Sequence, residues 1–152
     1  MGRVAAAVAA VAGVLVAGCG SAHQAAPATA FLTGLRVQAK SVSFDFESAP
    51  GDVAAAYQPK SRLVESGSGA PVALAGKAYL VIHFRPAATA DAEGAKLRLT
   101  YRGPRRVSGS GPVLEVAKTS DFEADLAWAI GLERHLPFRV ARDDTTVTVT
   151  FG

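Results

Sequence analysis

The feature that most constrains the fold of this chain is apolar and polar residues alternating in short runs, with turn-forming residues between the runs. A period of two places every second side chain on one face of a β-strand. The clearest runs are residues 41–46, 78–84, 97–101 and 146–151. We therefore expect each of these runs to form a strand with one face in the core.

Two less regular runs, 113–118 and 126–130, also fit strands. In the second run, Leu126, Trp128 and Ile130 would share one face and the alanines the other. Because alanine and leucine favour helices, a short helix over residues 125–132 is the alternative. Residues 53–57 stay ambiguous, since three successive alanines mark no preferred face.

The carboxyl-terminal part predicts a closing hairpin. Residues 138–142 and the threonine–valine run at 146–151 flank Asp143 and Asp144, which tolerate the backbone angles of a tight turn. Glycine, proline and serine dominate the other connections, at 50–52, 67–69, 103–104 and 108–112. With short strands and no long amphipathic helix, the chain is predicted to be an all-β protein with a β-sandwich fold.

The amino terminus resembles a bacterial lipoprotein signal peptide. Arg3 precedes an apolar run over residues 4–16, and the small residues Ala17 and Gly18 stand directly before Cys19. The run is shorter than the roughly 20 residues that span a bilayer. We expect removal of residues 1–18 and lipidation of Cys19, through a diacylglyceryl thioether and acyl chains such as palmitate. An ordinary secretory signal and a retained helical anchor are the alternatives.

These expectations define three segments: a signal peptide at 1–18, a flexible tether at 19–33 that starts with the lipidated cysteine, and a β-sandwich domain at 34–152. The tether is predicted from its small, weakly polar residues, which show no period. It would hold the domain at the extracytoplasmic face of the cell membrane. The chain has one cysteine, so no thiol remains for a disulfide or a catalytic cysteine once Cys19 carries lipid.

Length and charge narrow the function further. The 152 residues suffice for one domain with a sizeable core. The net charge of +3 is too small to indicate nucleic acid as a partner, because nucleic-acid ligands usually carry a clustered basic face.

Several segments, in order, resemble the AMIN-like domain of actinobacterial envelope proteins and lipoproteins. The resemblance spans roughly residues 35–151, and its most specific part is the order Phe-Glu, Trp, Ile-Gly-Leu and Pro-Phe-Arg-Val between Phe122 and Val140. It implies a β-sandwich with a non-catalytic, envelope-binding role, through peptidoglycan or an envelope protein. The chain departs from the family pattern at residues 39–42, which lack an Asp-Arg pair, and at 143–146, where an Asn-Pro-Pro-Arg-like turn is usual.

Catalytic and metal-binding patterns are weak. His23, His83 and His135 have no metal-ligand spacing, so no cofactor or metal is predicted. The serines of 108–111 lack the strand-turn-helix context of a nucleophile elbow. Period two would align Asp121, Glu123 and Asp125 along one solvated edge, without the facing geometry of a glycosidase pair. The chain is therefore predicted not to be an enzyme, unless the fold brings His83 or His135 against a carboxylate or serine in a cleft.

A basic turn supplies the candidate ligand site: Tyr101, Arg102, Arg105 and Arg106. Guanidinium groups bind phosphates or carboxylates through paired hydrogen bonds, as in anionic wall polymers or wall peptides. The alternative is that these arginines keep a loop soluble. Trp128, Phe122 and Phe138 are interpreted as core residues rather than sugar-stacking ones.

Together these features predict a lipid-anchored envelope lipoprotein. Its domain would bind peptidoglycan, an anionic wall polymer or an envelope protein. The alternative function is that of a carrier that holds a lipid or glycolipid in an apolar cavity of several hundred Å3.

Overall fold

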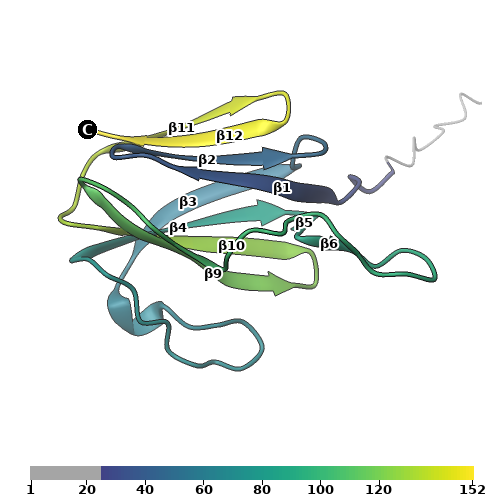
Figure 1. Ribbon diagram of the computed structural model, residues 1–152, viewed down its shortest axis with the longest axis horizontal. Helices are drawn as coiled ribbons and strands as arrows, with labels where there is room; N and C mark the ends of the chain where they lie inside the picture. Colours follow the sequence, from purple (N-terminus) through teal and green to yellow (C-terminus); the bar gives the residue numbers. More distant parts are fainter. Residues whose placement is uncertain (1–24) are drawn as a thin grey trace, which may run out of the picture.

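The computed structural model describes residues 25–152, which form two five-stranded β-sheets packed as a sandwich (Figure 1). The first sheet has the order β11-β12-β2-β1-β5, and the second has the order β3-β4-β10-β9-β8. All neighbours within them are antiparallel except β1 and β5. The first sheet contains β1 (Ala30–Val37), β2 (Ser41–Phe46), β5 (Ala87–Ala88), β11 (Phe138–Asp143) and β12 (Thr146–Phe151). The second contains β3 (Asp52–Gln58), β4 (Ala78–Arg85), β8 (Arg106–Ser108), β9 (Val113–Phe122) and β10 (Asp125–Leu132).

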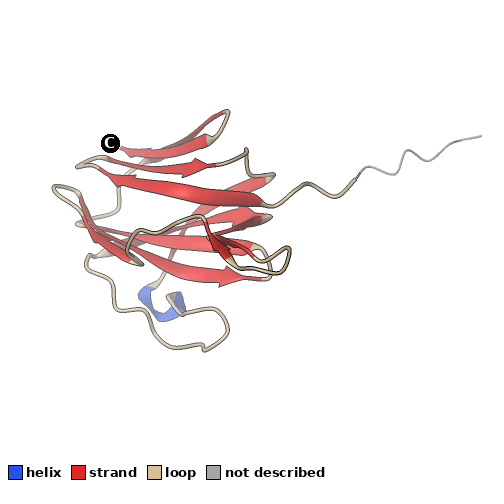
Figure 2. Cartoon of the chain, turned by 45° about the vertical axis from the view of Figure 1, so that its right-hand side comes forward, coloured by secondary structure: helices blue, strands red, loops and turns tan. Residues whose placement is uncertain are grey.

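Two small elements lie outside these sheets. Strands β6 (Ala90–Asp91) and β7 (Arg98–Leu99) pair with each other as a short arm. The 3-10 turn η1 (Lys60–Arg62) is the only helical segment among residues 25–152, and it lies on the outer side of the second sheet (Figure 2). No helix in this part of the chain is long and apolar enough to cross a membrane.

The space between the sheets is filled by large apolar side chains. Phe44 of β2 meets Phe84 of β4 with ring centroids 4.9 Å apart, and Trp128 of β10 is fully buried beside Phe44. This packing does not favour the lipid-carrier alternative, which requires an apolar cavity between the sheets.

Most of the strands expected from alternation are confirmed. Residues 41–46, 78–84, 113–118, 126–130 and 146–151 all lie in strands. The ambiguous segment 53–57 belongs to β3, and the closing hairpin forms with Asp144 and Thr145 in its turn. The helix alternative for 125–132 is wrong, because β10 pairs with β9 over residues 125–132 and with β4 over residues 126–132.

The expected boundary between tether and domain, after Thr33, is too late. Strand β1 begins at Ala30, and the side chains of Ala30 and Leu32 are fully buried. This strand could not be predicted from the sequence, because Phe31 and Leu32 are the only large apolar residues near its start and small residues surround them. The signal peptide and Cys19 lie outside the described residues.

The expected half-buried strand over residues 97–101 is also wrong. Only Arg98 and Leu99 are extended, as β7 of the arm, and Leu97 and Leu99 are 66% and 52% exposed. The residues alternate as in a strand, but the arm projects from the sandwich and neither face meets the core. Tyr101, by contrast, packs against the core from its rim.

The carboxylates 121, 123 and 125 do not share one edge. A hairpin turn at Glu123 and Ala124 separates β9 from β10, and both residues have positive φ angles, 50° and 58°. Phe122 ends β9 at this turn and is 58% exposed, so its interpretation as a core residue is wrong. Phe138 does pack against the core, partly buried.

The sandwich has two distinct ends. At the end where β1 begins, called here the near end, Ala87 pairs with Ala30 and donates its N–H to the Ala124 carbonyl (2.8 Å). This bond places the β9–β10 turn beside the start of the domain. The opposite end, called the far end, holds the carboxyl terminus and the segment that joins β10 to β11 (Figure 1).

Candidate functional site

The long connection between β3 and β4, residues 59–77, folds back over the outer face of the second sheet (Figure 2). We call it the cover loop. Its buried residues Leu63, Val72 and Leu74 form a second apolar cluster with strand residues such as Val81 and Ala129. Gly131 of β10 makes this close approach possible, because a Cβ there would overlap the Ala75 carbonyl. The cover loop is therefore an integral layer of the fold.

The arginines predicted from the sequence lie beside this cover loop, and two of them fasten it. Arg105 Nη2 lies 3.3 Å from Glu65 Oε1. Arg106 Nη1 lies 2.9 Å from Glu115 Oε1 and donates to the Ala73 carbonyl (2.6 Å). Arg102 is exposed and has no ion pair with any residue of 25–152. Their role in ligand binding remains a prediction, and Arg102 alone has no competing carboxylate.

Tyr101, the fourth residue of the predicted ligand site, packs against the core and is not a free surface side chain. Its ring meets Trp128 edge-on at 5.7 Å between centroids, and its hydroxyl donates to the Pro104 carbonyl (3.0 Å). Burial raises the pKa of the Tyr101 hydroxyl. Trp128 is a core residue, as expected.

A groove of about 700 Å3 lies at the far end, where β3 ends, β4 begins and β10 leads into β11. We call it the far-end groove. Its walls combine basic and aromatic side chains with a few small ones. They are Tyr57, Gln58, Pro59, Lys60, Lys77, Ala78, Tyr79, Arg134 and His135.

Positive charge dominates this groove. Lys60 and Lys77 are exposed, and neither has a carboxylate within ion-pair distance among the residues that the structure describes. Arg134 is paired with the adjacent Glu133 (3.0 Å). The groove thus offers two unmatched ammonium groups to a negatively charged ligand.

The aromatic residues of the groove are held in place. The Tyr57 ring stacks on His135 with centroids 3.8 Å apart. The Tyr57 hydroxyl donates to the Leu136 carbonyl (2.6 Å) and accepts the Leu136 N–H (3.2 Å). The Tyr79 hydroxyl donates to the Gly76 carbonyl (2.6 Å). Tyr79 is buried, so the stacked pair of Tyr57 and His135 supplies the flat surface suited to stacking on sugars or peptide planes.

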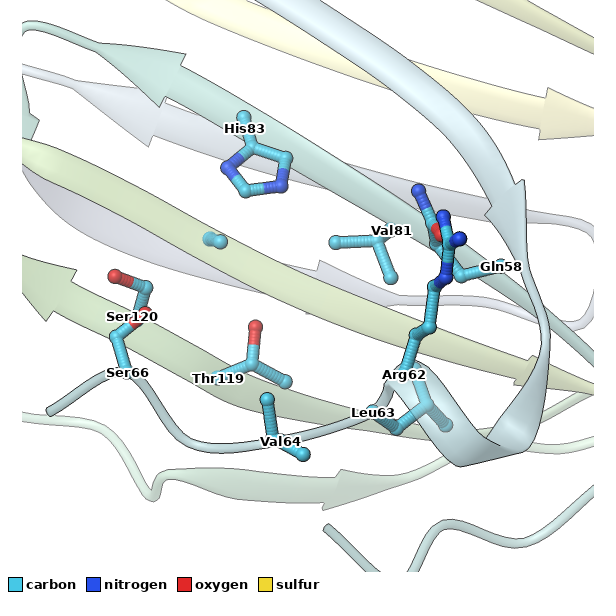
Figure 3. Close-up of a pocket in the computed structure, with 10 residues that line it drawn as sticks. Gln58, Arg62, Leu63, Val64, Ser66, Val81, His83, Thr119 and Ser120 are labelled. Atoms are coloured by element: carbon cyan, nitrogen blue, oxygen red, sulfur yellow. The ribbon is translucent and has the colours of Figure 1, made fainter. Parts of the chain in front are cut away.

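A smaller cleft of about 250 Å3 opens between the cover loop and the outer face of β4, β9 and β10 (Figure 3). We call it the loop cleft. Val81 and Ala127 lie in it as small apolar groups, and Arg62 extends from η1 toward Gln58. The remaining lining residues are Leu63, Val64, Ser66, His83, Thr119 and Ser120.

His83 meets a carboxylate next to this cleft. Its Nδ1 lies 2.9 Å from Asp125 Oδ1, while Arg85 Nη2 donates to Asp125 Oδ2 (2.8 Å). Burial raises the pKa of Asp125, but the hydrogen bonds and charges of Arg85 and His83 bring it below its ordinary value. The strand position of a half-buried His83 was expected from the sequence; its pairing with Asp125 was not.

The cleft does not assemble a nucleophile. No hydrogen bond joins His83 to Ser66 or Ser120 within residues 25–152, and the Ser120 hydroxyl donates to the Asp125 carbonyl (2.8 Å). A serine hydrolase requires the base to contact the nucleophile. The described residues also contain no group of three or more His, Cys, Asp or Glu side chains placed to hold a metal.

The far-end groove was not recognised from the sequence. Its basic residues are at positions 60, 77, 134 and 135, so no local cluster of charge marks them. Only the pairing of β3 with β4, and of β4 with β10, brings them to one end.

Comparison with known protein families gives one match: the family model described as the AMIN-like domain covers residues 31–149. Comparisons with curated proteins and with solved structures returned no match.

Proposed function

Because this chain belongs to the AMIN-like domain family, we propose that it is an envelope lipoprotein whose domain binds an anionic component of the cell wall through the far-end groove. AMIN-like domains are typically non-catalytic binding domains associated with peptidoglycan and the cell envelope. To this general role the proposal adds the binding site, which is the far-end groove, and the negative charge of the ligand. Peptidoglycan and anionic wall polymers are the candidate ligands.

The observation that carries the proposal is the composition of the far-end groove. Lys60 and Lys77 supply unmatched positive charge, and the stacked rings of Tyr57 and His135 supply a flat surface beside it. Wall glycans present sugar faces, and wall peptides and polymers present carboxylates or phosphates. Ammonium groups and aromatic rings recognise these two kinds of group.

The proposal includes anchoring at the membrane. The Cys19 motif supports a lipid anchor on the extracytoplasmic face. No more than about 40 Å of extended chain separates Cys19 from Ala30, at about 3.5 Å per residue. Mass spectrometry of the protein purified from cell membranes should find a diacylglyceryl group on Cys19. An unmodified amino terminus would remove the anchor from the proposal.

Wall binding is tested by co-sedimentation of the detergent-solubilised full chain with purified peptidoglycan sacculi. The variant Lys60→Glu/Lys77→Glu reverses the unmatched charges of the groove. The matched control Lys96→Glu/Arg102→Glu changes the net charge equally, away from the groove. We expect retention of the wild type and of the control, and loss of retention in the groove variant.

Two results would contradict the proposal. Failure of the wild type to sediment with sacculi would exclude wall binding. Loss of retention in the control but not in the groove variant would move the site to the arginine turn, where Arg102, Arg105 and Arg106 were predicted to bind. The Arg102→Ala/Arg105→Ala/Arg106→Ala variant would then identify that site.

A second candidate function, binding an envelope protein, shares the same family background. The unmatched lysines of the far-end groove favour wall binding over it. The proposal therefore stays with the wall.

A further inference from the structure

We infer that the loop cleft is a second binding site, which takes the free carboxylate of a short peptide with small aliphatic side chains. The inference deepens the proposed function and rests on it for its biological source, since wall peptides supply such termini. The cleft lies on the outer face of β4, next to the far-end groove, and Gln58 lines both.

The donor groups of the cleft determine the charge of its ligand. Arg62 lines it, is exposed, and forms no ion pair with another residue of 25–152. The Gln58 amide lies toward the same end of the cleft (Figure 3). A guanidinium group binds a carboxylate through two parallel hydrogen bonds, and a neighbouring amide adds a donor.

The carboxylate that borders the cleft does not cancel this charge. Asp125 is matched by Arg85 on one oxygen and by His83 on the other. Glu65, at the other margin of the cover loop, is paired with Arg105. The positive charge of Arg62 therefore remains available to a bound anion.

The floor of the cleft determines which ligand side chains it favours. Val81 and Ala127 are buried members of the outer apolar cluster, and they give the cleft a floor of small apolar groups. The volume of about 250 Å3 is also below the range of about 300–1,000 Å3 that is usual for pockets that hold drug-sized ligands. Methyl-sized side chains fit this floor.

The other end of the cleft is polar and suits a peptide backbone. Ser66, Thr119 and His83 line it opposite Arg62 (Figure 3). With Nδ1 of His83 engaged by Asp125, the Nε2 atom is the ring nitrogen left for a ligand. Hydroxyl and imidazole groups match the amide N–H and carbonyl groups that precede a terminal carboxylate.

The test uses soluble peptides, so its result does not depend on sacculi. The full chain is titrated with acetyl-Ala-Ala carrying a free carboxylate, in both chiral forms, and with the corresponding carboxamides. NMR chemical shifts of labelled protein report the affinity and the position of binding. We expect a free-acid form to bind with shifts at Val81, His83 and Ala127, and the carboxamide to bind about tenfold or more weakly.

A matched pair of variants tests the role of Arg62. Arg62→Gln should weaken binding of the free acid about tenfold, whereas Lys96→Gln, at an exposed position between β6 and β7, should leave it unchanged. Unchanged thermal unfolding in both variants shows that the fold is intact. Equal binding of acid and carboxamide, equal affinity of Arg62→Gln and wild type, or no binding of either chiral form would each overturn the inference.

These outcomes are separable from those of the proposed function. If sacculi retain the wild type while the peptides do not bind, the loop cleft is wrong and wall binding stands. If the peptides bind as expected but sacculi do not retain the chain, the carboxylate site stands and its ligand has another source.

Discussion

At the scale of single residues, Asp121 shows how one carboxylate joins separate parts of the fold. Its carboxylate accepts hydrogen bonds from Lys118 Nζ (2.8 Å) and from the Thr89 N–H (3.2 Å) and hydroxyl. Thr89 is buried directly before β6, so these bonds hold the arm to the second sheet. Burial raises the pKa of Asp121, but the bonds from Lys118 and Thr89 lower it below its ordinary value near 3.8.

Substitution Asp121→Asn should therefore destabilise the protein in a pH-dependent way. The pKa of Asp121 is lower in the folded state than in the unfolded one, so its stabilisation is complete above about pH 4 and is lost as the pH falls through the folded-state pKa. At pH 6 we expect a loss of about 1–3 kcal/mol in the free energy of unfolding. Urea unfolding at pH 6 and pH 2.5 measures this difference.

The exposed Glu93, also in the arm region, provides the control. Glu93→Gln should change the free energy of unfolding by less than about 0.5 kcal/mol at either pH. An Asp121→Asn effect of the same size at both pH values would contradict an ionic origin.

Among the elements, the β9–β10 hairpin carries a turn that its own residues do not favour. Glu123 and Ala124 both adopt left-handed angles, with φ of 50° and 58°. Such a two-residue turn prefers Asn-Gly, because residues with a larger side chain are strained there. The dipeptide Glu-Ala does not indicate a turn. The sequence therefore predicted, wrongly, that the carboxylates of residues 121, 123 and 125 lie along one edge.

Replacing Glu123 and Ala124 by Asn and Gly should stabilise the protein by about 1–2 kcal/mol. The hydrogen bond from Ala87 to the carbonyl of residue 124 is a backbone contact and remains. Thermal or urea unfolding measures the gain. The same pair of substitutions at Asp144 and Thr145 is the comparison, and an equal or larger gain there would show that turn strain at 123–124 is not the cause.

The cover loop yields a second prediction at this scale. Arg106 joins Glu115 and the Ala73 carbonyl, and Glu115 also accepts the Ala75 N–H (2.9 Å). Arg106→Ala should loosen residues 59–77 and raise their amide hydrogen exchange about fivefold, since one charged contact of about 1 kcal/mol is lost. Exchange in β4 and β10 should not change.

Arg102→Ala is the matched control, because Arg102 makes no ion pair within the described residues. It should leave exchange in the cover loop unchanged. Equal exchange in both variants would show that Arg106 does not fasten the loop.

The elements also show how far the sequence predicts this fold. Strands β2 and β12 follow from alternation because one of their faces meets the core and the other does not. Strand β4 alternates in sequence as well, although the cover loop buries Tyr79 and Val81 on its outer face. Strand β3 was ambiguous because its alanines satisfy both environments. Residues 97–101 alternate without a core to face, so periodicity alone predicted burial that the arm does not provide.

The candidate site was less predictable than the fold. The arginines of residues 102–106 form the densest basic run in the sequence, yet Arg105 and Arg106 are paired with carboxylates from distant segments. The far-end groove has no local pattern, because its residues come from the two ends of the cover loop and from the β10–β11 connection, which meet only after the strands pair. Whether a charged side chain can bind a ligand depends on whether it already has an ion-pair partner. That partner is determined by the tertiary structure.

On the scale of the whole molecule, positive charge is concentrated at the far end of the sandwich. Near-end turns and strand termini carry both signs in similar number: Glu47, Asp52, Asp91, Glu93, Asp121, Glu123, Asp125, Asp143 and Asp144, with Arg85, Lys96, Arg98, Arg102, Arg105, Arg106, Lys118 and Arg142. The far end carries mainly cations: Lys40, Lys60, Arg62, Lys77 and Arg134, against Glu133. A chain anchored through its amino terminus would direct its basic end away from the membrane and toward the wall.

The positive charge of the far end predicts that retention on sacculi depends on salt. Exposed charges are screened over about 10 Å at 0.1 M ionic strength and about 3 Å at 1 M. Retention of the wild type should fall severalfold between about 0.05 M and 0.5 M sodium chloride. Retention that does not change with salt would show that the groove binds through apolar or neutral contacts and not through Lys60 and Lys77.

The central claim, that the far-end groove contacts the wall, is tested most directly by mapping where a soluble wall fragment binds. Amide NMR spectra of the labelled chain are recorded with and without anionic glycan fragments released from sacculi. The predicted result is a set of shifted signals at Tyr57, Lys77 and His135. Shifts confined to Arg102, Arg105 and Arg106, or no shifts at all, would contradict it.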